Sequence, residues 1–219
     1  MRTTTQVRWG LSLLCAAAIL IAAATANAQT DPGRAFLLVA HPQLADPNFA
    51  GTVVLAVRVD EGGPLGVILN RPTTTALSSV YPDRADAAAR NDLVFFGGPV
   101  QPDALLFAFR SATKPPQGML VVEDIYISGY SRVLDELLKH PENAAEQRFF
   151  VGYSGWSEGQ LEAEISDGGW YLLPLDTGAI FRMNPRTLYD DLLKRALVPR
   201  IEARLDDERP AAGAHELSP

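Results

Sequence analysis

Residues 52–73, TVVLAVRVDEGGPLGVILNRPT, contain two mainly apolar stretches joined by a short glycine-rich segment. Thr52–Val59 and Leu65–Leu69 are rich in β-branched residues, which favours strands. The residues between them, Asp60-Glu61-Gly62-Gly63-Pro64, have the composition of a hairpin loop. Because both stretches are nearly continuous apolar runs, the strands are expected to be covered on both faces. This segment therefore predicts a hairpin within a sheet that other elements enclose.

The remaining secondary structure is predicted from residue type and periodicity. Six more strands are expected between Gly, Pro, Asn or Asp residues: Arg34–Ala40, Leu93–Phe96, Leu105–Arg110, Met119–Tyr126, Phe149–Tyr153 and Trp170–Leu173. Helices are expected at Ser131–His140, Ser157–Ile165 and residues 184–196, with a short one within Thr75–Ala89. Because strands and helices do not alternate strictly, the order favours a single α+β domain over a doubly wound sheet.

Three local signals set the expected helix boundaries. Ser157 and Gln160 have the spacing of a capping box at the start of one helix. Gly168-Gly169 follows that helix and suits a left-handed stop. Asn184-Pro185 has the order of an N-cap and a first-turn proline, which predicts that the last helix begins there.

The N-terminal segment has the layout of a secretory signal peptide. Arg2 and Arg8 precede the apolar run Leu11–Ala24, and Ala26-Asn27-Ala28 has the pattern of a cleavage site. The run of 14 residues is shorter than the roughly 20 that span a bilayer. We expect cleavage after Ala28 and a periplasmic or secreted protein without a stable membrane span; an uncleaved membrane anchor is the alternative. The chain then divides into a signal (1–28), an α+β domain (29–204) and a disordered acidic tail (205–219).

Composition excludes several classes of function. The 219 residues hold 19 Lys and Arg against 26 Asp and Glu, a formal net charge of −7. Removing residues 1–28 would remove two Arg and no acid, leaving 17 against 26 and a charge of −9. This balance argues against nucleic-acid binding, which needs a basic face. The single Cys excludes an internal disulfide, and the three His are far apart in sequence, so we expect no metal site and no cofactor.

Four loops at strand ends carry the candidate ligand-binding residues, which are His41, Asp46, Asn48, Asn70, Arg71, Gly97, Gly98, Tyr153 and Trp156. Each also has a structural interpretation. The first loop suits a rigid turn with Phe49 in the core. Arg71 suits either a carboxylate or phosphate ligand or a salt bridge to Asp46. Gly97-Gly98 suits a tight turn or an anion-binding nest, and the two aromatic residues suit a core or a pocket wall.

Taken in order, the loop motifs resemble the bacterial YqgE/AlgH family. They are residues 46–49 (DPNF), 66–73 (GVILNRPT), 95–100 (FFGGPV) and 152–156 (GYSGW) with 159–162 (GQLE). The resemblance implies an α+β domain whose branched, mostly antiparallel or mixed sheet curls into a small barrel flanked by helices. It implies no catalytic residues. The export signal, Gly51 where a basic residue is common, and Val57-Arg58 in place of a Cys-His pair depart from the family pattern.

The function expected from these observations is a non-enzymatic binding or regulatory domain outside the cytoplasm, with a small molecule or a protein as partner. The loops are polar, aromatic and rigid, and no credible catalytic set accompanies them. The alternative is a hydrolase with an unrecognised polar site that uses His41, Ser154 or Asp46. For Ser154, the nucleophile-elbow pattern Gly-x-Ser-x-Gly fails because Trp156 occupies the last position.

Overall fold

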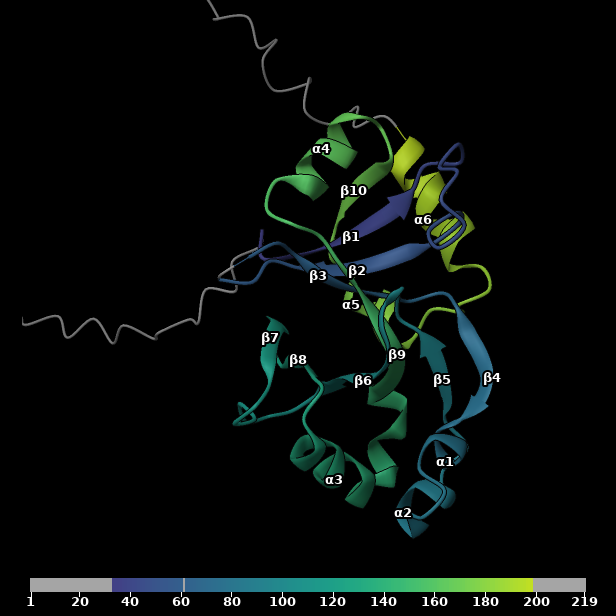
Figure 1. Cartoon of the computed structure of the whole chain (residues 1–219), viewed down its shortest axis with the longest axis vertical. Coiled ribbons are helices and arrows are strands. Elements are labelled where there is room, and N and C mark those ends of the chain that lie inside the picture. Colours follow the sequence, from purple (N-terminus) through teal and green to yellow (C-terminus); the bar gives the residue numbers. More distant parts are fainter. Residues whose placement is uncertain (1–32, 61, 199–219) are drawn as a thin grey trace, which may run out of the picture.

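The computed structural model describes residues 33–60 and 62–198, and Figure 1 shows how their elements are arranged. The predicted signal peptide and acidic tail lie outside these residues. The strands are β1 Ala35–Ala40, β2 Val53–Val57, β3 Leu65–Ile68, β4 Pro72–Ala76, β5 Leu93–Phe96, β6 Val100–Arg110, β7 Met119–Val122, β8 Ile125–Ser128, β9 Gln147–Gly155 and β10 Trp170–Pro174. The helices are α1 Leu77–Val80, α2 Ala85–Ala88, α3 Ser131–Lys139, α4 Gln160–Ser166, α5 Thr177–Phe181 and α6 Leu188–Leu197, with a 3-10 helix at Pro141–Glu146.

The strands form one branched, mixed sheet that curls into a half-barrel. Its main path is β10-β1-β2-β3-β9-β6-β8-β7, and all pairs along this path are antiparallel. Strand β9 is the branch point because it pairs with β3 and β6 and also, in parallel, with β5, which carries β4. The α+β class and the branched, mixed sheet expected from the family resemblance are confirmed.

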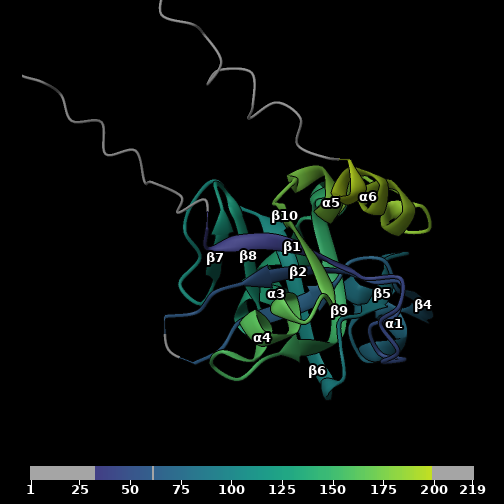
Figure 2. The ribbon, with the colours of Figure 1, turned by 90° about the horizontal axis from the view of Figure 1, so that it is seen from above.

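The hairpin predicted from residues 52–73 is formed by β2 and β3, whose register places Leu55 opposite Val67. Every residue of β1 and β2 is buried. On one face, Leu37 and Leu55 pack with the C-terminal helices α5 and α6, and on the other face Leu38 and Val54 pack around α4. Figure 2 shows α5 and α6 together beside β1 and β10. The prediction that continuous apolar strands are covered on both faces is therefore confirmed.

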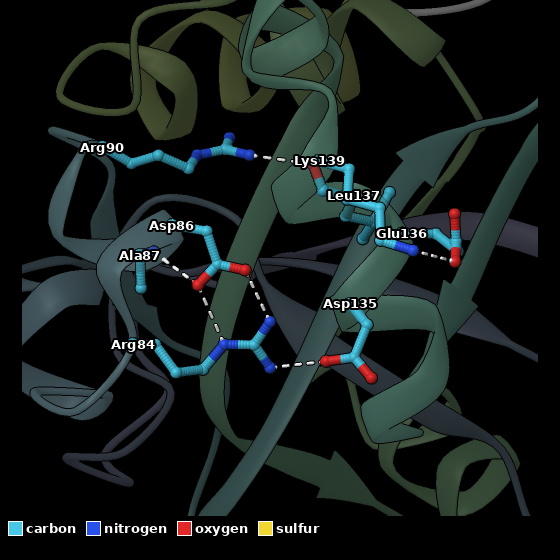
Figure 3. A network of polar contacts seen from close by, with 8 residues as sticks. All are labelled: Arg84, Asp86, Ala87, Arg90, Asp135, Glu136, Leu137 and Lys139. Atoms are coloured by element: carbon cyan, nitrogen blue, oxygen red, sulfur yellow. Dashed lines mark hydrogen bonds and ion pairs between the residues drawn. The ribbon is translucent and has the colours of Figure 1, made fainter.

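A third hydrophobic cluster lies under α3 at the other end of the molecule. Leu134 and Leu138 of α3 pack against Phe107 and Phe149 of β6 and β9. Figure 3 shows how this helix is tied to α2: Arg84 donates to Asp86 at 2.7 Å and to Asp135 at 2.5 Å. These two hydrogen bonds raise the pKa of Arg84.

Several boundaries differ from the prediction. The single strand expected at Met119–Tyr126 is a hairpin, because Glu123 adopts φ +50° and the chain reverses between β7 and β8. Asp124 at this turn forms an ion pair with Arg110 and accepts the backbone N–H of Ser111 through its carbonyl at 2.8 Å. The sequence alone does not reveal this tertiary contact, so the break was missed.

The helices also begin and end at slightly different residues. Helix α6 begins at Leu188, since Asn184 instead caps a preceding turn by accepting the N–H of Arg186 at 3.0 Å. The short helix expected within Thr75–Ala89 is two short helices, α1 and α2, while α5 and the polar strand β4 were not predicted. The left-handed stop is confirmed at Gly168, which has φ +77°.

Candidate functional site

The loop between β1 and β2 is held in one conformation by its own turn residues. The Oδ1 atom of Asp46 accepts the backbone N–H of Asn48 at 2.8 Å, and the carbonyl of Asp46 accepts the N–H groups of Phe49 and Ala50. This is the turn expected of an Asp before Pro-Asn. It directs Phe49 toward the protein interior, where it contacts two tryptophans.

Arg71 holds the same loop through hydrogen bonds to its backbone. Its guanidinium donates to the carbonyls of Asn48 (2.6 Å), Ala50 (3.0 Å) and Pro47 (3.1 Å). Burial lowers the pKa of Arg71, and the negative charge of Asp46 partly offsets this. Three of the five guanidinium N–H groups are therefore used by backbone oxygens of the loop, and Arg71 forms no salt bridge to Asp46 among the described residues.

Asn70 joins the loop to the sheet. Its side-chain oxygen accepts the N–H of Val53 at 2.8 Å, and its amide nitrogen donates to the carbonyl of Gly51 at 2.9 Å. Asn70 thus satisfies a donor at the start of β2 and an acceptor at the end of the loop. Together, Asn70 and Arg71 fix the loop that carries Asp46 and Asn48.

Behind the loop lies a cluster of three aromatic rings joined by one carboxylate. The ring centroid of Phe49 is 6.3 Å from that of Trp156 and 5.5 Å from that of Trp170. Both indole N–H groups donate to the same oxygen of Glu164, at 3.0 Å from Trp156 and 2.9 Å from Trp170. The second carboxylate oxygen accepts the side-chain amide of Gln160 at 2.9 Å. Glu164 therefore links α4 to the start of β10.

These elements enclose a cleft of about 720 Å³, which we call the acidic cleft. Three carboxylates line it, those of Asp46, Glu164 and Asp167, and no Lys or Arg is among the lining residues in the described part of the chain. His41 also lines it, and its Nδ1 accepts the N–H of Gln43 at 3.2 Å. The full lining is His41, Gln43, Leu44, Ala45, Asp46, Phe49, Gly155, Trp156, Gln160, Glu164, Asp167, Gly168, Gly169 and Trp170.

Gly97 and Gly98 lie inside the protein, where two chain segments cross. A Cβ at Gly97 would lie 2.2 Å from the carbonyl oxygen of Gly152, and one at Gly98 would lie 2.4 Å from the backbone of Tyr153. The carbonyl of Gly97 also accepts the N–H of Ile68 and the hydroxyl of Ser154. Only glycine permits this close approach, so these residues set the packing of the turn between β5 and β6 against β9.

The structure thus brings only part of the predicted set together. His41, Asp46 and Trp156 line the acidic cleft, and Tyr153 lies beside Trp156 in a neighbouring depression of about 400 Å³. Asn48, Asn70, Arg71, Gly97 and Gly98 are not among the lining residues of the acidic cleft. Ser154 is fully buried and its hydroxyl donates to the carbonyl of Gly97, whereas the Nδ1 of His41, which the hydrolase alternative would pair with it, accepts the N–H of Gln43.

Sequence reasoning missed Glu164, Trp170 and Asp167. A partial signal for Glu164 existed, because Gln160 and Glu164 are four residues apart within the predicted helix Ser157–Ile165, which places their side chains on one helix face. Trp170 carried no such signal, because it reaches the cluster only after the chain reverses at Gly168. Within residues 33–60 and 62–198, no group of three or more His, Cys, Asp or Glu side chains is placed to hold a metal ion.

The fold and the order of its motifs match one known family. The AlgH-like family model, DUF179, matches residues 37–199, which include the whole sheet and the acidic cleft apart from the first two residues of β1. The chain belongs to the AlgH-like family. A UPF0301 protein of Streptomyces avermitilis is 40% identical to this AlgH-like chain over 168 residues, covering 73% of this chain and 84% of the relative. A UPF0301 protein of Thermobifida fusca is 36% identical over 167 residues, with the same coverage.

Two solved structures have the same fold. The solution structure of AlgH from Pseudomonas aeruginosa has a TM-score of 0.63 at 28% identity, covering 82% of this chain and 95% of that one. A crystal structure of a Corynebacterium diphtheriae protein has a TM-score of 0.62 at 21% identity, covering 75% and 87%. The family and fold inferred from the loop motifs are therefore confirmed, and the export signal stays a prediction. None of the helices in the described residues is long and apolar enough to span a membrane.

Proposed function

We propose that this AlgH-like chain is a non-enzymatic binding or regulatory domain that acts outside the cytoplasm and holds its ligand in the acidic cleft. The observation that carries the proposal is the lining of this cleft, which combines half-buried Phe49 and two tryptophans with three carboxylates. A concave site with apolar walls and a few convergent polar groups is the usual form of a small-molecule site. Binding is favoured over hydrolysis because Ser154 is fully buried and its hydroxyl donates to the carbonyl of Gly97.

The charge of the cleft selects the class of ligand. Neither Glu164 nor Asp167 forms an ion pair with any described residue. Asp46 forms none either, although its charge interacts with that of Arg71. A ligand that brings a positive charge would gain from these carboxylates, and aromatic faces attract cations as well. We therefore expect a protonated amine on a planar or apolar body, either as a small molecule or as a side chain of a protein partner.

The cleft can be tested with phenethylamine, which joins an ammonium group to a flat ring. Trp156 and Trp170 both lie in the cleft, so tryptophan fluorescence of the purified chain reports binding directly. The double variant Asp46→Asn/Asp167→Asn removes two charges, while the amide oxygen introduced at position 46 can still accept the hydrogen bond of the turn. We expect the variant to weaken binding about tenfold, since exposed ionic contacts each contribute up to about 1 kcal/mol.

The matched control is Asp190→Asn/Asp191→Asn, which removes two exposed acids from α6 and should leave the affinity unchanged. Phenethyl alcohol, which has no charge, should bind more weakly than phenethylamine. Equal binding of the amine to both double variants would refute a ligand site in the acidic cleft.

The export part of the proposal is tested separately. The protein recovered outside the cytoplasm should begin at Gln29, and recovery of the chain with Met1 in the cytoplasm would contradict export.

A further inference from the structure

A second cleft, of about 750 Å³, lies at the end of the molecule remote from the acidic cleft. Figure 1 shows α3, which borders this second cleft, and α4, which borders the acidic cleft, at opposite ends of the structure. One wall is the segment 111–117 that follows β6, and the other is one side of α3 with the 3-10 helix after it. Neither the family resemblance nor the candidate residues of the sequence point to this place.

The walls are held firmly. The hydroxyl of Ser111 donates to the carbonyl of Thr113 at 2.6 Å, and the carbonyl of Gln117 accepts the hydroxyl of buried Ser128 at 2.7 Å. Between them, Pro115-Pro116 restricts the backbone. The cleft is therefore a formed concavity rather than a gap beside a loose loop.

The lining is apolar inside and cationic at its rim. Phe109, Val133 and Leu137 are buried side chains that border the cleft. Lys114 and Arg132 are exposed, and neither forms an ion pair with any described residue. We call this the basic cleft.

The other charged groups of the lining are already paired. Glu136 forms an ion pair with Lys139 at 2.7 Å, as drawn in Figure 3. Arg110 pairs with Asp124, and His140 contacts Glu142 at 2.9 Å. The charge left for a ligand is therefore that of Lys114 and Arg132, in a chain whose formal net charge is −7.

A buried amide adds a second, independent feature. Gln147 is 8% exposed and lines the cleft, and its oxygen accepts the guanidinium of Arg90 at 2.8 Å. Arg90 thereby fixes which end of the amide is the donor. That nitrogen has only long contacts, 3.4 Å to the carbonyl of Leu137 and 3.5 Å to that of His140. Hydrogen bonds of this length are weak, so a buried donor in the wall is poorly satisfied.

We propose that the basic cleft binds a small organic anion, a phosphate monoester or a carboxylate, that carries an apolar body. Its anionic group would meet Lys114 and Arg132, with the side-chain amide of Gln147 as a neutral donor, and its apolar body would cover Phe109, Val133 and Leu137. Hydrogen bonds between an anion and the charged groups of Lys or Arg are stronger than hydrogen bonds between neutral groups. This site is separate from the acidic cleft and does not depend on the function proposed for it.

The test uses phenyl phosphate and benzoate as probes. Their binding is measured from the changes in the backbone amide shifts of the 15N-labelled chain. We expect at least one probe to change the amide shifts of segment 111–117 and of α3. Its affinity should decrease when the salt concentration is raised from about 0.1 M to about 1 M, because the screening length shortens from about 10 Å to about 3 Å. The variant Lys114→Ala/Arg132→Ala should weaken that probe about tenfold. Which probe binds more tightly identifies the head group.

The matched control is Arg186→Ala/Lys194→Ala, which removes an equal charge from exposed positions that form no ion pair with a described residue. It should bind the probe like the parent chain. Phenol and inorganic phosphate should each bind more weakly than phenyl phosphate. The proposal is overturned if neither probe shifts these residues, if both double variants bind alike, or if inorganic phosphate binds as tightly as phenyl phosphate. The phenethylamine titration of the acidic cleft should be the same in all these variants.

Discussion

Glu164 is the residue whose removal should reveal how the acidic cleft is built. Its carboxylate accepts three hydrogen bonds, from the indoles of Trp156 and Trp170 and from the amide of Gln160. The two tryptophans are only 7% and 4% exposed. In Glu164→Ala, both indole N–H groups lose their protein partner, and water from the acidic cleft, which all three residues line, can replace it only in part.

The magnitude follows from these contacts. An unsatisfied buried donor costs about 1–3 kcal/mol, so losing the partner of two indoles that border the cleft should lower the free energy of unfolding by about 2–4 kcal/mol. Glu164→Gln is the matched comparison. Both indoles donate to a single oxygen, which the amide oxygen of Gln can replace, so only the bond from Gln160 and the charge are lost. We expect a loss of about 1 kcal/mol for this variant.

Urea unfolding followed by far-ultraviolet circular dichroism measures both values. Tryptophan emission of the folded state provides a second readout, because Glu164→Ala should loosen the packing of Trp156 and Trp170 and shift the emission to longer wavelength, while Glu164→Gln should not. A Glu164→Ala chain within about 1 kcal/mol of the parent, with unchanged emission, would show that the carboxylate does not hold the aromatic cluster together.

Two further variants probe other parts of the fold. Gly97→Ala places a Cβ 2.2 Å from a carbonyl oxygen of β9, so thermal denaturation should show a loss of at least about 3 kcal/mol; Gly155→Ala, whose Cβ has ordinary 3.4 Å contacts, is the control and should be far milder. Asp176→Asn keeps the helix cap to Gly178 but removes the 2.8 Å ion pair with Arg195. The hydrogen bond from Arg195 lowers the pKa of Asp176, so the pair stabilises near neutral pH by about 0.5 kcal/mol and this contribution disappears as the pH falls through the lowered pKa. A stability difference that is the same at neutral and at acidic pH would contradict this assignment.

The strands that could be predicted most directly from sequence are those whose residues are buried on both faces of the sheet. The strands β1 and β2 read as continuous apolar runs because helices cover both of their faces, and the structure places both strands in two hydrophobic clusters at once. Strand β4 was missed for the opposite reason. Its residues Pro72–Ala76 are mostly exposed and lie at an edge of the sheet, where pairing with β5 rather than an apolar pattern decides the conformation.

The candidate site shows a different limit. The motif containing Asn70 and Arg71 was predicted to contribute ligand-binding residues, and in the structure these side chains hold backbone groups of the loop at 47–53. Carbonyl and amide partners have no signature in a sequence, because every residue carries them. A polar side chain that fixes a loop therefore looks the same in sequence as one that binds a ligand, and only the filled hydrogen bonds distinguish the two.

Strand β9 connects the two clefts. Its first residue, Gln147, lines the basic cleft, and its last, Gly155, lines the acidic cleft. A strand of this length places its ends on the order of 25 Å apart, well beyond the roughly 8 Å over which charges interact at physiological salt. Attraction between a cation in one cleft and an anion in the other is therefore screened. Any coupling would have to pass through β9 itself, whose Phe149 and Phe150 are fully buried on opposite faces of the sheet. Because a strand packed on both faces has little freedom to shift, we expect the two clefts to bind independently.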